Sequence, residues 1–196
     1  MDKVEIEKAK YEEVHSRTFS YGLGLRQVND LKNESYDFSK RFNEIVKQSN
    51  TCLDIACGGG TIMDYVDYLG CIPTGIDISE SAIKKVDKSY TSVVGSCHQL
   101  PFKDNQFDLV YFLDGMEHIP LEIENEALHE PFRVSKNFVC HAIALESSVH
   151  FGEELHCNLK DPEEWREIIN KIANKLGWNE EMYYLRNNTV HLIYKR

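Results

Sequence analysis

The sequence of 196 residues lacks any apolar run long enough to cross a membrane, and it lacks a C-x-x-C pair. A membrane-spanning helix needs about 20 mostly apolar residues in a row, and closely paired cysteines are typical of zinc and redox sites. The six cysteines lie mostly in apolar, strand-like stretches, and the charged opening segment MDKVEIEKAKYEEVHS does not resemble a secretory signal. We therefore expect reduced cysteines, no membrane association and a cytoplasmic protein.

Positive charge is also scarce. Lys and Arg total 22 against 32 Asp and Glu, which gives a net charge of -10. Proteins that bind nucleic acids gain much of their affinity from basic side chains that neutralise phosphates. The acidic balance therefore argues against a nucleic acid partner.

No two histidines have the spacing that places a pair of metal ligands on one helix. The eight histidines form no H-x-x-x-H or H-E-x-x-H pattern, in which both rings would share one helix face. Asp114, Glu117 and Glu146 could supply oxygen ligands, but their spacing is not diagnostic. We therefore expect no metal ion.

Short apolar segments alternate with helix-like segments along the chain, a pattern typical of a parallel sheet whose strands are covered on both faces. Asn187-Asn188 joins two more strand-like segments and predicts a closing hairpin. We expect an α/β fold: a doubly wound, mostly parallel, seven-stranded sheet with a C-terminal antiparallel hairpin. The five expected parallel strands are 51–56, 71–78, 91–96, 107–114 and 137–145.

No linker divides the sequence, so we expect one domain over residues 1–196, with residues 1–35 as a mobile lid. Residues 16–34, which include Gly22 and Gly24, are expected to be irregular. A helix is expected around residues 121–130, ending near Pro131 because proline removes a backbone donor.

The segment LDIACGGGTIMDYV (residues 53–66) passes from a strand-like run through three glycines into a helix-like run. In open α/β sheets, ligands bind at the carboxyl ends of the strands. Glycines let a ligand approach the backbone there, and free N–H groups at a helix start can bind it. Asp77 ends the next strand, 23 residues after Asp54, where an acid would hold ribose hydroxyls. The pattern predicts a cofactor that carries a nucleoside.

A dinucleotide is a weaker candidate for this cofactor. The G-x-G-x-x-G pattern needs a third glycine for close packing of helix on strand. Counted from Gly58, that position is Met63. A dinucleotide-dependent oxidoreductase is therefore the last of the hypotheses.

The same residues resemble the class I S-adenosylmethionine (SAM)-dependent methyltransferases. Residues 54–60 match the family motif D-x-G-x-G-x-G, except that Ala56 replaces the first glycine. Asp77 in GIDIS matches the ribose-binding acid, and GSCHQLPFKDNQFDLVYFLDGMEHI resembles the stretch from the third strand through the fourth. Where the family usually has an acid near the adenine, this chain has Ser96, Cys97 and His98. The resemblance covers about residues 50–145.

The resemblance implies SAM as cofactor and S-adenosylhomocysteine (SAH) as product. It also implies a set of cofactor-binding residues on the loops that follow the first four strands. These residues are Asp54, Ala56, Cys57, Gly58, Gly60, Asp77, Ile78, Ser96, Cys97, His98, Leu113 and Asp114.

Methyl transfer also needs an acceptor held in line with the sulfonium and, for a hydroxyl or ammonium, a base. His118 in DGMEHIP is the first choice as catalytic base, and His156 is the second. The alternatives are that His118 anchors the next helix and that His156 only orders its loop. The expected substrate-binding residues are Tyr21, Glu117, Glu146 and His150.

We expect transfer of a methyl group to an oxygen or nitrogen of a small molecule, with a sugar or sugar-linked metabolite as the first guess. One alternative is a methyltransferase that acts on nucleic acid or protein. Another is a non-catalytic SAM-binding subunit that serves a partner protein. The oligomeric state is not indicated by the sequence.

Overall fold

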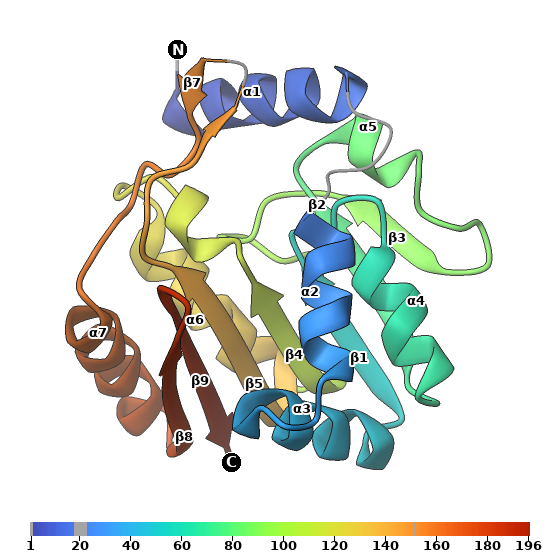
Figure 1. The fold of residues 1–196 in the computed structure, drawn as a ribbon, viewed down its shortest axis with the longest axis vertical. Helices are drawn as coiled ribbons and strands as arrows, with labels where there is room; N and C mark the ends of the chain where they lie inside the picture. The colour runs from blue at the N-terminus through green and yellow to red at the C-terminus, as the bar shows by residue number, and fades with distance from the viewer. Residues whose placement is uncertain (1, 18–22, 151) are drawn as a thin grey trace.

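The computed structural model describes residues 2–17, 23–150 and 152–196. A seven-stranded sheet runs through the middle of the molecule in the order β3-β2-β1-β4-β5-β9-β8 (Figure 1). The strands β1 to β5 pair in parallel, whereas β9 runs antiparallel to both β5 and β8. The strand bounds are β1 (Thr51–Ile55), β2 (Ile72–Asp77), β3 (Thr91–Val94), β4 (Phe107–Leu113), β5 (Ser135–Ala144), β8 (Asn179–Arg186) and β9 (Thr189–Lys195). The expected α/β sheet with its C-terminal hairpin is confirmed.

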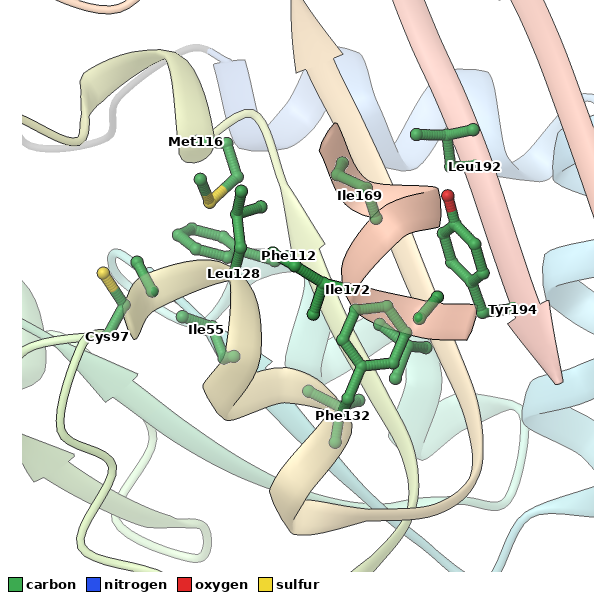
Figure 2. Close-up of a cluster of buried hydrophobic side chains, with 14 of the residues drawn as sticks. Ile55, Cys97, Phe112, Met116, Leu128, Phe132, Ile169, Ile172, Leu192 and Tyr194 are labelled. Atoms are coloured by element: carbon green, nitrogen blue, oxygen red, sulfur yellow. The ribbon is translucent and has the colours of Figure 1, made fainter. Parts of the chain in front are cut away.

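Helices cover both faces of this sheet. On one face, α6 (Glu124–Val134) and α7 (Pro162–Lys175) pack on the strands, and Figure 2 shows Phe112 of β4 with Leu128 and Phe132 of α6. On the other face, Tyr111 of β4 belongs to a cluster with α2 (Leu23–Lys32), α3 (Asp37–Gln48) and α4 (Thr61–Tyr68). Neighbouring residues of β4 thus enter opposite cores, as the alternation of side chains along a strand requires.

Three smaller elements and α1 (Lys3–Arg17) gather around the carboxyl ends of the parallel strands (Figure 1). The short helix α5 (Glu80–Ile83) follows β2, and the 3₁₀ turn η1 (Met116–His118) follows β4. A two-stranded ribbon of β6 (Val149–His150) and β7 (Glu153–Glu154) lies beside α1. Among the described residues, no helix has the length and apolar character that a membrane span requires.

The turn between β8 and β9 shows how the sequence sets the end of the fold. Asn187 and Asn188 have φ angles of 49° and 54°. Two consecutive left-handed residues close a tight hairpin whose twist matches that of its strands, and asparagine tolerates this conformation better than most residues. The expected hairpin is confirmed at these two residues.

Two expectations about local structure are wrong. Within the segment expected to be irregular, residues 23–32 form α2, because Val28 and Leu31 are buried against the cluster that contains α3 and α4. The helix expected at 121–130 starts at Glu124 and runs through Pro131 to Val134. Pro131 lies in the last turn and is itself buried. Its packing therefore offsets the loss of the backbone hydrogen bond that proline cannot donate.

Substitution of Trp165 tests how much the α7 side of the core contributes to the stability of the fold. Its side chain is fully buried in the cluster between α6, α7 and the sheet. Trp165→Ala should lower the free energy of unfolding by about 3–5 kcal/mol through lost burial and the cavity left behind. Urea denaturation followed by circular dichroism measures this loss. The exposed neighbour Glu164 is the control, because Glu164→Ala should change the free energy by less than about 0.5 kcal/mol.

Candidate cofactor and acceptor site

A cavity of about 440 Å³ lies between α1 and the carboxyl ends of the parallel strands. Pockets that hold small molecules have volumes of roughly 300–1,000 Å³. Its floor is built from the loops that follow β1, β2, β3 and β4. The lining residues on these loops and strand ends include Asp54, Ala56, Cys57, Gly58, Asp77, Ile78, Ser96, Cys97, Leu113 and Asp114. Ten of the twelve residues expected to bind the cofactor thus line one space, whereas Gly60 and His98 do not.

The loop after β1 turns sharply because three of its residues have left-handed backbones. The φ angles are 59° at Ala56, 53° at Gly58 and 85° at Gly60. Glycine adopts such angles readily, whereas alanine there is strained. Gly60 directly precedes α4, and its left-handed backbone turns the chain into this helix.

Asp77 links the end of β2 to this loop. Its Oδ2 accepts a hydrogen bond from the Gly58 N–H at 2.9 Å, and its Oδ1 accepts one from the Ser79 N–H at 2.8 Å. Burial raises the pKa of Asp77, while these two N–H groups act in the opposite direction. Asp54 is buried more deeply, and burial holds the pKa of its carboxyl well above the usual range. The two acids therefore lie in different environments at adjacent strand ends.

The loop after β3 supplies small side chains to the cavity. Ser96 and Cys97 line it, and the Ser96 hydroxyl lies 2.7 Å from Nδ1 of His98. Burial raises the pKa of Cys97 to about 12, and it also raises the pKa of Cys57 well above its usual value. Both thiols are therefore protonated at neutral pH and are poor nucleophiles.

Helix α1 forms the roof of the cavity through one of its faces. Val4, Glu7, Tyr11 and His15 all line the cavity, and their spacing of three or four residues places them on one side of a helix. Next to this face, Glu12 accepts hydrogen bonds from the hydroxyls of Ser79 and Ser81. The helix is thus attached to the segment that follows β2.

Several lining residues were not anticipated from the sequence, and three of them are polar residues with hydrogen bonds near the cavity. Lys85 donates a hydrogen bond to the carbonyl of His15, and Gln27 donates to Asp114 at 2.7 Å. Both Lys85 and Gln27 line the cavity, as does His15 itself. The spacing of residues 4, 7, 11 and 15 indicates that His15 shares one helix face with the other three. It does not indicate that this face covers the cavity.

His118 lies at the β4 side of the cavity, in η1. Its Nδ1 is 2.5 Å from the Tyr11 hydroxyl and 3.1 Å from the carbonyl oxygen of Leu155. Burial lowers the pKa of His118 to about 3. The ring is therefore neutral at pH 7 but is a weak base, since a general base works best with a pKa near the working pH.

None of the other residues expected to act in catalysis or substrate binding is among the described residues that line the cavity. His156 does not line the cavity, but its ring centroid lies 4.6 Å from that of His118. Glu117 is fully buried behind the cavity wall. Glu146 bonds to the Asn188 side chain at the β8–β9 turn, away from the cavity lining. Tyr21 lies outside the described residues, and so does the side chain of His150.

Residues 53–138 match the family model described as a methyltransferase domain. Over these residues the chain is similar to the methyltransferase domain family. A solved structure of magnesium protoporphyrin IX methyltransferase from Synechocystis PCC 6803 with bound SAM is 15% identical, with a TM-score of 0.69 over 100% of this chain and 98% of that chain. The chain therefore has the fold that its sequence motifs indicate.

Curated relatives match parts of this chain. Identity is 29% over 85 residues with the sterol 24-C-methyltransferase of Schizosaccharomyces pombe and 25% over 154 residues with norajmaline N-methyltransferase of Rauvolfia serpentina. These matches cover 38% and 74% of this chain. The chain spans only 22% and 51% of the two relatives.

Asp77→Asn tests the ribose-binding role expected of the acid after β2. An amide keeps the size of the side chain but places a donor where Gly58 and Ser79 also donate, and it removes the negative charge that would accept from ribose hydroxyls. We expect SAM affinity, measured by calorimetry, to fall at least about tenfold, which is about 1.4 kcal/mol. Asp64→Asn on the exposed face of α4 is the control and should bind normally. Unchanged affinity in Asp77→Asn would refute the assignment.

Proposed function

We propose that this protein transfers the methyl group of SAM to an oxygen or nitrogen of a small molecule that enters the cavity beneath α1. The observation that supports this most is the convergence of the β1 glycine loop, the β2 acid and the β3 loop on one cavity. These are the elements that a nucleoside with an amino acid tail requires: close backbone, a carboxylate for the ribose and a small-residue pocket for the base.

In this proposal the cofactor lies along the strand ends. Its ribose binds Asp77, its adenine lies against Ser96 and Cys97, and its methionine end points toward Leu113 and Asp114. The sulfonium methyl then faces the β4 side of the cavity, where His118 lies. The sulfonium already activates the methyl group, so the protein has mainly to hold the acceptor about 3–3.5 Å away and in line.

A small acceptor fits the site better than a macromolecule. Tyr11 approaches His118 and Glu12 bonds to Ser79, so α1 covers the cavity at two places. A nucleic acid or protein side chain would have to displace this helix, and the net charge of -10 disfavours nucleic acid. The sugar acceptor inferred from the sequence stays a prediction, because the named relatives act on a sterol, on norajmaline and on a porphyrin.

A direct test separates the enzyme from a binding subunit and from an oxidoreductase. SAM, but not NAD, should raise the melting temperature of the protein, because a ligand that binds only the folded state stabilises it. Incubation with SAM and a panel of sterols, phenols, amines and sugars should release SAH, measured by mass spectrometry, with at least one class. Binding of SAM without SAH release from any class would favour the non-catalytic subunit, and no binding of SAM would refute the proposal.

We also propose that residues 1–35 act as a lid, for which Glu12 provides a test. Glu12→Ala removes the acceptor for Ser79 and Ser81, so amides of α1 should exchange with deuterium faster while those of β1 and β4 should not change. Glu13 is the matched control, since it is exposed and pairs with Arg17 within the same helix. Equal amide exchange in α1 of Glu12→Ala and Glu13→Ala would contradict a role for Glu12 in holding α1 over the cavity.

A further inference from the structure

Three side chains meet at the β4 side of the cavity although they are not neighbours in the sequence. One potential ligand atom from each of Glu117, His118 and His156 lies within 4.8 Å of the others. Glu117 and His118 come from the turn η1, whereas His156 comes from the segment between β7 and α7. One carboxylate and two imidazoles form a ligand set that is typical of divalent transition metal ions.

The hydrogen bonds of both histidines leave the same ring nitrogen available. His156 Nδ1 bonds to the carbonyl oxygen of Glu146, and His118 Nδ1 lies 3.1 Å from the carbonyl oxygen of Leu155. A carbonyl oxygen only accepts, so each Nδ1 carries the proton and each Nε2 presents a lone pair. The Tyr11 hydroxyl, 2.5 Å from His118 Nδ1, fits this state as a second acceptor. Backbone carbonyls hold metal-binding histidines in the same way.

Glu117 supplies the third donor and is unusual among the buried acids. Its side chain is 0% exposed, and neither carboxylate oxygen has a well-formed hydrogen bond among the described residues, although the backbones of Glu117 and Ala144 approach the carboxylate. A buried carboxylate without a partner is costly. Asp114 lies close enough to raise the cost further through charge repulsion. A cation between Glu117 and the two histidines would remove this cost.

We propose that Glu117, His118 and His156 bind a divalent transition metal ion such as Zn²⁺ or Mn²⁺. Ligand atoms lie about 2.0–2.2 Å from such an ion and hence roughly 3–3.5 Å from each other. The observed atoms need to close by about 1 Å, and the half-buried His156 lies on a non-helical segment that can make this adjustment. The spacing of these residues in the sequence did not indicate a metal site, since His156 follows His118 by 38 residues.

The ion has a role in catalysis if the proposed function holds, on which this step rests. Three protein ligands leave at least one coordination position open, and His118 lines the cavity. A hydroxyl oxygen of the acceptor binds that position, and the ion lowers its pKa so that its proton leaves to solvent. The oxygen then bonds to the methyl carbon while the S–C bond breaks and its electron pair stays on sulfur. The acceptor class is therefore a molecule with a hydroxyl that can bind a metal ion.

The decisive experiment is a metal titration that does not depend on turnover. Protein stripped with a chelator is titrated with Co²⁺, whose visible absorption reports its ligands, and with Zn²⁺ in a calorimeter. We expect one equivalent of each ion to bind, and His156→Ala and Glu117→Gln to weaken binding at least about tenfold. His129→Ala is the matched control, because the half-buried His129 on α6 bonds to the carbonyl of Asn125, is not part of the cluster and should leave binding unchanged.

The outcomes separate the metal site from the proposed function. Absence of Co²⁺ and Zn²⁺ binding at millimolar concentration, or equal binding by wild type and His156→Ala, overturns the site. His156→Ala is the main variant because Glu117→Gln alters the core, and circular dichroism checks both folds. SAM affinity of His156→Ala should equal that of wild type. If wild type binds metal but no SAM, the proposed function fails while the metal site stands.

Discussion

The hydrogen bond from the Gly58 N–H to the Asp77 carboxylate joins the two strand ends on which the site depends. It can form because β1 and β2 are parallel neighbours, so that both end at the same edge of the sheet. The left-handed residues of the β1 loop direct the Gly58 N–H toward that edge. Every other part of the site, including the roof formed by α1, is arranged around this junction.

Much of the sheet could be predicted because its strands carry strong local signals. The run before Gly58 and the Asn187-Asn188 pair each identify an element without knowledge of its neighbours. Helix α2 could not be predicted in the same way. Its amphipathic segment is short, and the helix forms because Val28 and Leu31 pack on other helices. Intrinsic helix propensity does not include this tertiary contribution. The end of α6 could not be predicted from Pro131 either, because burial of Pro131 lets the helix continue to Val134.

The cofactor side of the site was more predictable than the acceptor side. Asp54 and Asp77 lie in the last two residues of β1 and β2, and Gly58 follows β1 closely, so the strand ends fix the positions of all three. His15 reaches the cavity only through the packing of α1 over the sheet edge, and Lys85, which follows α5, bonds to its carbonyl. The contact between His118 and His156 depends on the path of the segment between β7 and α7. Such contacts arise from the tertiary structure and have no sequence spacing of their own.

The position of α1 has a kinetic consequence. One helix contacts the β2 loop through Glu12 and the β4 turn through Tyr11, so the two ends of the cavity share a single gate. If cofactor and acceptor occupy those two ends, movement of this one helix uncovers both of them. Release of one is then coupled to release of the other through the same helix.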